Sequence, residues 1–406
     1  MTTRRSLLRS LPAGLAAGAL APWARLALSQ TVAPGANRFV FVMLRGGLDG
    51  LAAVPAIGDP AFADARGVLA LPPGEALPLD GVFALHPLLQ QLHAMYGRGE
   101  LAVLHAVGLP YRERSHFDAQ QLLESGGTRP FELATGWLGR ALSAAAGQRV
   151  PLQAVALETA VPLVLRGPAA VDTWAPSALP EPGADLVERL EMLYRGDPAL
   201  AQALARARGL RNEPGMAANP QGAGQPSVGR GRGTALALAL AAKATEFLQR
   251  GTQVAVMEMG GWDSHINQAA PNGPLSNNLR LLDAVLQTLR DGLQASGTWG
   301  RTVVLVATEF GREVAVNGNQ GTDHGSGGAA FVLGGAVHGG RVIADWPGLA
   351  RPARFEGRDL RITTDLRAAL RGLLADHLQV PRAALDAAVL PGSSGLAALS
   401  VLRTRG

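Results

Sequence analysis

The sequence predicts an α/β protein, a three-layer αβα sandwich around a mostly parallel central sheet. Two observations lead to this prediction. Short apolar runs of strand length alternate along the chain with longer stretches whose apolar residues recur at helical spacing. Carboxylates and histidines follow several of the short runs directly, which is where sites lie in open α/β sheets. Right-handed strand–helix–strand crossovers would place these strand ends along one edge of the sheet.

Composition narrows the class of protein. Of 406 residues, 47% are hydrophobic and 17% are charged, as in a globular protein. The net charge of +5 includes four arginines of an N-terminal leader, so the remainder is close to neutral and lacks the basic stripe of a nucleic-acid binder. There are no cysteines, which excludes disulfides and thiolate metal sites. Any metal must therefore be held by oxygen and imidazole ligands.

Residues 1–29 resemble a twin-arginine signal peptide. Arg4 and Arg5 precede a modest apolar stretch from Leu11 to Ala21, and small residues suitable for cleavage follow. The apolar stretch is shorter than the ~20 residues needed to span a bilayer. We therefore expect export by the twin-arginine translocase to the periplasm or beyond, with no stable membrane span. An ordinary basic leader or a short anchor is the alternative.

The first half of the mature chain opens with a β-rich apolar run that ends in a glycine pair and a carboxylate, typical of a binding turn. Leucines at helical spacing and a second apolar run follow a stretch rich in Pro and Gly. The expected elements are a strand at 38–44, a turn at 45–50, a surface excursion over 52–83, a helix at 85–96, a strand at 101–107, and a helix with Ser115 as its N-cap.

The second half continues the alternation, and its amphipathic stretch at 278–293 carries one apolar stripe. We expect strands at 153–158, 163–165, 253–259, 302–308 and 330–333, and helices at 183–210, 234–249, 278–293 and 364–377. Residues 211–233 contain much Pro and Gly and are expected to form a flexible surface loop. The predicted α/β domain spans 36–380, and 381–406 form a C-terminal tail.

Metal-type ligands recur just past the predicted strands. They are Asp49, His116 with Asp118, Asp263 with His265, Glu309, and Asp323 with His324 in a glycine-rich loop. Such carboxylate and imidazole groups suit one or two divalent ions, with zinc, manganese, magnesium and calcium all open. Each ligand has a structural alternative, because a strand-end aspartate often caps a turn or helix and Asp263 with His265 could form an Asx-turn beside a surface histidine.

Several other residues flank these ligands. Arg45, Arg114 and Arg312 could each pair with a site carboxylate or receive an anionic substrate group through the planar guanidinium. The backbone N–H groups of Gly46 and Gly47 could also face an anion. Ser115 is a candidate nucleophile, although a role as helix N-cap is sufficient to explain it.

The motifs RGGLDGL, SHFDAQ, GGWDSH, TEFGR and GTDHGSGG, together with the leader, resemble domain-of-unknown-function family 1501 over about residues 36–380. That family is similar to the alkaline-phosphatase superfamily, which includes sulfatases and whose members bind two metals at the strand ends. The resemblance implies one metal site with Asp49 and Glu309 and another with Asp263, His265 and His324. Phe310 stands where a further histidine ligand is expected, and Gly50 and Leu51 replace the usual nucleophile after Asp49.

Two functions follow as hypotheses. The first is an exported metal-dependent hydrolase of phosphate or sulfate esters, small or polymeric, which uses metal-activated water or an unidentified nucleophile, with arginines stabilising the anionic transition state. The alternative is a non-catalytic exported binding protein on a degenerate phosphatase-like scaffold, favoured by Phe310 and by the missing nucleophile. The clustered Asp263, His265, Asp323 and His324 favour the hydrolase, because such groups are costly to desolvate.

Overall fold

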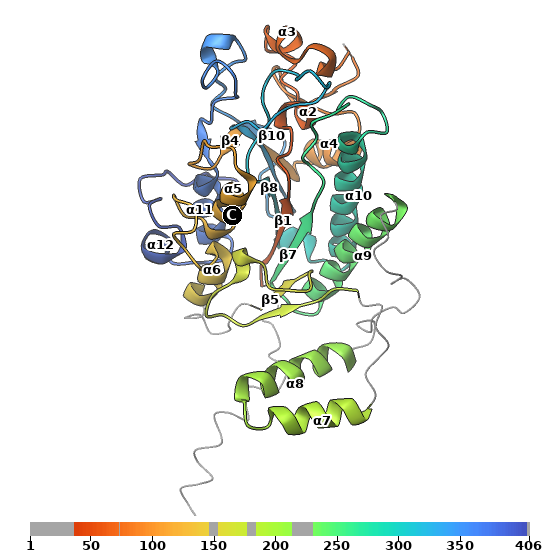
Figure 1. Ribbon diagram of the computed structural model, residues 1–406, viewed down its shortest axis with the longest axis vertical. Helices are drawn as coiled ribbons and strands as arrows, with labels where there is room; N and C mark the ends of the chain where they lie inside the picture. The colour runs from red at the N-terminus through yellow and green to blue at the C-terminus, as the bar shows by residue number, and fades with distance from the viewer. Residues whose placement is uncertain (1–35, 73, 146–152, 177–183, 213–229, 404–406) are drawn as a thin grey trace, which may run out of the picture.

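The structure is a computed structural model and describes residues 36–72, 74–145, 153–176, 184–212 and 230–403. The predicted signal peptide and most of the predicted 211–233 loop lie outside these ranges. A nine-stranded sheet runs through the body in the order β10-β4-β9-β8-β1-β7-β5-β6, and β11 pairs with β4 (Figure 1). No helix among the described residues is long and apolar enough to cross a bilayer.

Every pairing in this sheet is parallel except those of β9, which is antiparallel to both β4 and β8. The strands are β1 (Arg38–Leu44), β4 (Leu101–Gly108), β5 (Ala154–Ala156), β6 (Val171–Thr173), β7 (Val254–Met259), β8 (Thr302–Thr308), β9 (Gly328–Leu333), β10 (Arg341–Ile343) and β11 (Thr364–Asp365). A separate hairpin pairs β2 (Leu77–Pro78) with β3 (Ala84–Leu85). The mostly parallel sheet predicted from the sequence is confirmed.

Helices cover both faces of the sheet (Figure 1). Alternate residues of β1 pack into two separate cores because successive strand side chains point to opposite faces. One core contains residues from α4 (Gln90–Gly97), α9 (Arg230–Gln249) and α10 (Pro274–Ala295), and the other contains residues from α5 (His116–Ser125), α6 (Trp137–Ala145) and α11 (Leu366–Asp376). The predicted three-layer architecture is therefore confirmed.

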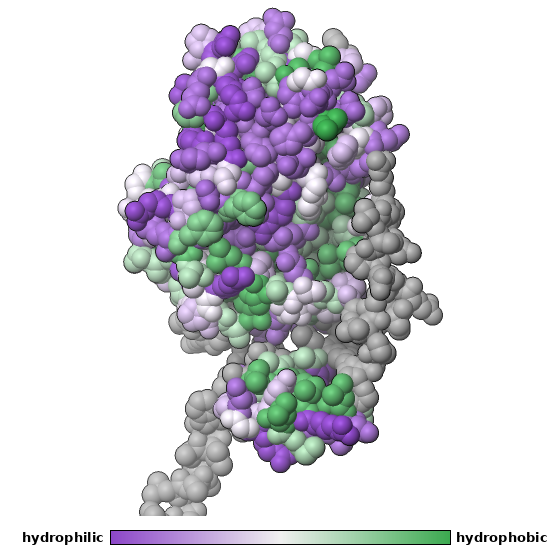
Figure 2. All heavy atoms as spheres, in the orientation of Figure 1, coloured by the Kyte–Doolittle hydropathy of each residue, from purple (hydrophilic) through white to green (hydrophobic). Residues whose placement is uncertain are grey.

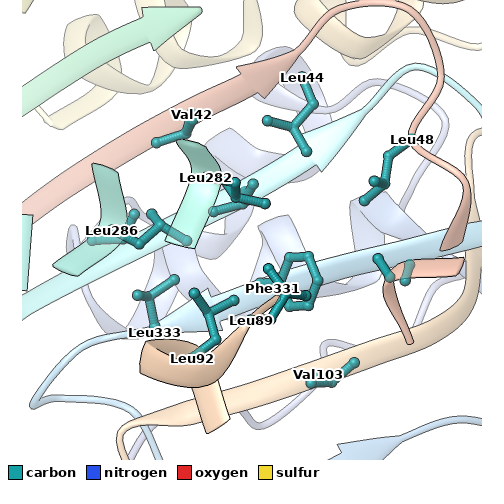
Figure 3. Packing of buried hydrophobic residues seen from close by; sticks show 14 of the residues in the cluster. Val42, Leu44, Leu48, Leu89, Leu92, Val103, Leu282, Leu286, Phe331 and Leu333 are labelled. Carbon is teal, nitrogen blue, oxygen red and sulfur yellow. The ribbon is translucent and has the colours of Figure 1, made fainter. Parts of the chain in front are cut away.

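The packing of α4 and α10 on the sheet follows from their apolar stripes. Leu282 and Leu286 lie one helical turn apart on α10, and both are fully buried together with Val42 and Leu333 (Figure 3). Removing one such leucine side chain costs about 2–5 kcal/mol. The helix begins at Pro274, four residues before the predicted start, since proline at the first turn has a suitable φ and no N–H to satisfy.

The strands at the centre of the sheet end level with one another. Leu44 at the end of β1 is in register with Met259 of β7 and with Thr308 of β8. The segments that follow these three strands therefore leave the sheet side by side. The loop 309–327 also returns to this edge, because β9 runs antiparallel to β8. This edge is where the predicted ligands lie.

Three local predictions were wrong, wholly or in part. The stretch 52–83 is a surface excursion only in part. It includes the end of α2 (Gly50–Ala53), α3 (Phe62–Arg66) and the 3-10 helix η1 (Gly67–Leu69), and it buries Val54 and Arg66 fully while Ile57 and Val68 are exposed. Residues Leu163–Leu165 form a 3-10 helix, η2, rather than a strand. The helix predicted from 85 begins at Gln90, because residues 84–85 pair with β2.

Two further parts complete the fold. The helices α7 (Ala184–Tyr194) and α8 (Pro198–Asn212) form a hairpin over the predicted helical stretch 183–210 and two residues beyond it, and none of the α7 residues is buried. Figure 2 shows hydrophobic residues on the face of this hairpin. After residue 380, α12 (Arg382–Ala384) and the π-helix η5 (Leu385–Val389) follow, and Leu385, Leu390 and Val401 are buried in the second core. The α/β body thus extends into the predicted tail.

Candidate metal centre

Four segments meet at the level edge of the sheet. His116 is the first residue of α5, and Asp263 with His265 follows β7. Glu309 follows β8 directly, and Asp323 with His324 lies in the loop that leads back to β9. All of these residues were predicted as ligands, and the structure brings them into one cluster.

Three imidazole rings form the centre of the cluster. The Nε2 atom of His324 lies 3.0 Å from Nε2 of His116 and 3.1 Å from Nε2 of His265. The Asp263 carboxylate joins them, with Oδ1 at 2.8 Å from the His265 Nε2 and 3.2 Å from the His324 Nε2. Its Oδ2 lies 3.5 Å from the His116 Nε2. The ligand atoms of His116, Asp263 and His324 thus lie close to one another, and His265 joins them through His324 and Asp263.

The second nitrogen of each ring is held by an acceptor. Nδ1 of His116 donates to Glu309 Oε1 at 2.8 Å, and Nδ1 of His265 donates to Asp323 Oδ1 at 3.0 Å. Nδ1 of His324 donates to the Arg114 carbonyl at 3.1 Å. A neutral ring whose proton is on Nδ1 presents a lone pair at Nε2. Such carboxylate and carbonyl partners are the usual support of metal-ligating histidines.

This arrangement fits a divalent metal ion. Lone pairs on nitrogens that lie about 3 Å apart repel one another unless a cation lies between them. Metal–nitrogen bonds of roughly 2.0–2.1 Å in a tetrahedral site separate the nitrogens by about 3.3 Å. The Nε2 atom of His324 lies at a similar distance from the Nε2 atoms of His116 and His265, 3.0 Å and 3.1 Å. Among the described residues, one group that could hold a metal ion has its ligand atoms within 4.8 Å of one another, and it consists of His116, Asp263 and His324. The side chains of His265 and Asp263 are 36% and 44% exposed, so solvent reaches the cluster.

The charges in the cluster are fixed by specific partners. Burial raises the pKa of Asp263, but the hydrogen bond and charge of Arg312 outweigh it and hold the pKa below its ordinary value. Burial likewise raises the pKa of Glu309, and hydrogen bonds from His116 and Gln120 more than offset this. The hydrogen bond to Glu309 raises the pKa of His116, whereas burial lowers that of His324. Both carboxylates are therefore ionised.

The predicted ligand Asp49 lies outside this cluster. It is buried, and its Oδ2 accepts a hydrogen bond from Arg66 at 2.5 Å and another from Gln268. Its Oδ1 caps α2 through the Ala52 N–H at 3.0 Å. Arg66 is fully buried as well and also donates to the Val314 carbonyl. The sequence offered no signal for Arg66, which lies in a Pro- and Gly-rich stretch without periodicity.

The three predicted anion-binding arginines are each engaged with carboxylates of the protein. Arg45 bonds Glu124 and Glu258, and Arg312 bonds Asp263 at 2.6 Å and the Thr322 carbonyl. Arg114 pairs with Asp359 and Glu356 and adopts a positive φ of 61°, with its carbonyl on His324. Arg312 and Arg114 thus support ligands of the cluster.

Other predicted residues have structural roles. Asp118 accepts from the Tyr111 hydroxyl at 2.9 Å and does not join the cluster. Ser115 occupies the N-cap position of α5 without a capping hydrogen bond from its side chain. Phe310 packs its ring 4.7 Å from the ring of His116 and 5.1 Å from that of His324. Phenylalanine here packs against two of the imidazoles.

The turn Arg45–Gly50 serves the site through its backbone. Gly46 has φ +121° and lies so close to the next loop that a Cβ would stand 2.5 Å from the Asp263 nitrogen. Its N–H donates to Glu309 Oε1 at 2.8 Å, so a carboxylate of the protein occupies the donor predicted to face an anion. A groove of about 660 Å³ between α4, α9 and α10 contains none of the clustered residues.

Comparison with known proteins gives the family. Residues 95–379 match the family described as "Protein of unknown function (DUF1501)". The chain belongs to this family. That membership confirms the resemblance seen in the motifs, of which SHFDAQ, GGWDSH, TEFGR and GTDHGSGG carry the residues of the cluster. A search of curated proteins finds no match.

Solved structures similar to this DUF1501 member are distant. The PsFucS1 sulfatase from Pseudoalteromonas sp. is 14% identical, with 80% of this chain and 67% of that chain covered and a TM-score of 0.38. A phosphonate monoester hydrolase of Agrobacterium radiobacter is 10% identical over 85% and 74%, with a TM-score of 0.37. A protein in the alkaline phosphatase superfamily from Vibrio parahaemolyticus is 14% identical over 74% and 60%, with a TM-score of 0.34. Likeness at this level carries no argument about activity.

Proposed function

We propose that this protein is an exported, metal-dependent hydrolase of phosphate or sulfate esters. One observation carries the proposal: ligand atoms of His116, Asp263 and His324 lie within 4.8 Å of one another at a solvent-accessible sheet edge, with His265 Nε2 3.1 Å from His324 Nε2. One ion is proposed rather than two. Asp49, the ligand expected for a second ion, already has its charge met by Arg66.

The ligand set favours zinc or manganese. Three imidazoles with one carboxylate suit ions of intermediate hardness, whereas magnesium and calcium prefer oxygen ligands throughout. The absence of cysteine removes the softer alternatives. Zinc is the first metal to test because imidazole nitrogens together with a carboxylate oxygen are a common zinc ligand set.

The residues of the chain prepare the site for an anionic ester. A divalent metal supplies Lewis-acid polarisation of the ester and a water that is nucleophilic at neutral pH. Glu309, Asp323 and the Arg114 carbonyl orient the three imidazoles, and Arg312 fixes Asp263. With neutral imidazoles, the charge of Arg312 balances that of Asp263, and a bound dication would be balanced by the carboxylates of Glu309 and Asp323 behind the rings. The metal-loaded site would then be close to neutral before the anionic ester group binds.

The non-catalytic alternative has its own support. Arg45, Arg114 and Arg312 are all paired with protein carboxylates, so none is held in reserve for a transition state. Ser115 is hydrogen-bonded to the Tyr111 hydroxyl, and among the described residues no histidine or carboxylate bonds its side chain as a general base would. A protein that binds metal and an anionic partner without turnover would also have these features.

A metal and activity assay separates the two functions. We expect purified protein to carry about one zinc or manganese per chain by elemental analysis and to hydrolyse aryl phosphates, phosphodiesters or aryl sulfates. His324→Ala should lose both metal and activity. His338→Ala, which changes an exposed histidine away from the cluster, is the matched control and should keep both. Bound metal without turnover of any ester class would support the non-catalytic binding protein. A metal content at background level would contradict both the hydrolase and the metal-binding protein.

Export is part of the proposal. We infer periplasmic or secreted localisation, with the twin-arginine translocase as a transient partner, from Arg4 and Arg5 ahead of the apolar stretch. Cell fractionation should find wild-type protein outside the cytoplasm. The double substitution Arg4→Lys with Arg5→Lys should retain it inside. Unchanged export of the double variant would contradict this route.

A further inference from the structure

We propose that Phe117 and Ile266 bind the ring-bearing alcohol portion of the ester, so that the enzyme prefers aryl or other cyclic esters to small alkyl ones. This inference rests on the proposed hydrolase function and specifies its substrate class. Phe117 is 81% exposed and directly follows the ligand residue His116. Ile266 is 58% exposed and directly follows the ligand residue His265.

The position of these side chains distinguishes them from ordinary exposed apolar residues. Single hydrophobic residues are common on protein surfaces and need no explanation. Here, however, two of the three residues that supply imidazoles are followed at once by a large exposed apolar side chain. On the face that Figure 2 shows, the upper half of the body is mostly hydrophilic. Exposed apolar side chains next to a polar centre are typical of sites that bind an amphipathic ligand.

Both side chains are carried on segments that the fold holds in place. Phe117 lies in the first turn of α5, whose residues Ala119, Leu122 and Leu123 are buried in the second core. Ile266 forms a backbone bridge with Gln320, and the neighbouring Asn267 N–H donates to the Asn319 carbonyl at 2.9 Å. The backbone at both residues is therefore anchored, which reduces the ordering cost of binding.

The solvent exposure of the cluster determines which part of the substrate Phe117 and Ile266 contact. The clustered side chains of Asp263 and His265 are about two-fifths exposed, so the ester group binds at the surface and not within an enclosed cavity. The alcohol portion then stays at the rim, where Phe117 and Ile266 are the apolar groups attached to the site. A phenyl or similar ring can stack on Phe117 and remove its face from water. A methyl group is too small to cover it.

Binding of two phosphonates to the zinc-loaded protein tests the inference without turnover. Phenylphosphonate and methylphosphonate carry the same anionic group and differ in the attached group alone. We expect titration calorimetry to give about tenfold tighter binding of phenylphosphonate, the effect of burying about 50–60 Å² of apolar surface. Phe117→Ala should bring the two affinities together, and Ile266→Ala should reduce the difference. Phe131→Ala is the matched control, because Phe131 is 69% exposed and lies beyond the far end of α5.

The outcomes separate this inference from the proposed function. If methylphosphonate binds to the wild type but not to His324→Ala, and phenylphosphonate binds no more tightly, the site is real and the apolar preference is wrong. If neither phosphonate binds, both proposals fail. If Phe117→Ala keeps the phenyl preference, or Phe131→Ala loses it equally, the assignment to Phe117 is overturned.

Discussion

Asp49 and Asp263 make the most instructive comparison in this molecule. Each follows a central strand, β1 or β7, and these strands end in register. The side chain of Asp263 is 44% exposed and faces three imidazoles, whereas that of Asp49 is 2% exposed and bonds Arg66. Two aspartates at equivalent strand ends thus have opposite roles.

The difference shows what makes a strand-end carboxylate available to a metal. A buried carboxylate needs its charge met, and an internal guanidinium meets the charge of Asp49 permanently. Arg312 also bonds Asp263, but it leaves the carboxylate facing solvent and the imidazoles. The position at the end of a strand is shared, and the nature of the partner separates a structural ion pair from a candidate ligand.

The largest expected effect comes from breaking the buried ion pair between Asp49 and Arg66. Arg66→Met should lower the free energy of unfolding by about 3–5 kcal/mol, because it leaves the Asp49 carboxylate buried without a counter-charge. Urea unfolding measures the loss. The double variant Asp49→Asn with Arg66→Met is the control and should lose less, since no charge remains buried. Equal losses in the single and double variants would contradict an ion-pair role.

The free energy of unfolding should also fall in acid, because of a buried histidine near Asp49. Burial lowers the pKa of His105 to about 4, and its Nε2 donates to the Val54 carbonyl near Asp49. The folded state therefore binds fewer protons than the unfolded state between pH 6.5 and 4. The stability from this group is present above pH 6.5 and is lost as the pH falls through 4, by about 3 kcal/mol.

Urea midpoints at pH 7 and pH 4.5 test this sensitivity. His105→Gln should show a smaller fall in the free energy of unfolding between the two pH values than the wild type. Part of the fall should remain, because burial also lowers the pKa of His86 to about 4. A wild-type midpoint that does not change with pH would exclude a buried neutral His105.

Metal addition should stabilise the protein through Asp263 and not through Asp49. Zinc at about one hundred times its dissociation constant should raise the free energy of unfolding of the wild type by about 2.7 kcal/mol. Asp263→Asn should weaken this gain strongly, and Asp49→Asn should leave it intact. Thermal unfolding with zinc and with a chelator makes the comparison. An equal loss of the zinc effect in both variants would place Asp49 in the metal site.

The residues that orient the imidazoles should have a smaller effect. Glu309→Gln keeps the size of the side chain but removes the negative charge beside His116 Nδ1. We expect it to lower metal affinity by about 10–100-fold, as loss of such partners commonly does. Competition with a chromophoric chelator measures the affinity. Retention of the wild-type value would mean that His116 is not a ligand.

The smallest effect is expected at Asp118, which was predicted as a ligand and bonds Tyr111 instead. Asp118→Asn keeps an acceptor for the Tyr111 hydroxyl and should change the free energy of unfolding by less than about 0.5 kcal/mol. Metal affinity should stay at the wild-type value. A marked fall in metal binding would return Asp118 to the site.

The sequence by itself determined the architecture and the region of the site. Apolar runs and helical stripes are local patterns, so they predicted the main strands, both helical layers and the strand ends at which His116, Asp263, His265, Glu309 and His324 lie. The departures came where local pattern is weak. The stretch 52–83 has no periodicity, and its buried packing depends on contacts with distant segments such as Val314.

Only the tertiary structure decided which of the predicted residues share a centre and which support it. Asp49, Asp263, Glu309 and Asp323 look alike in the sequence, each following a strand or lying in a glycine-rich loop. Arg66 neutralises the first, while Glu309 and Asp323 bond imidazole nitrogens on the side away from the common centre. These roles depend on partners far away in the chain, and the free energy of a charge depends on what surrounds it in three dimensions.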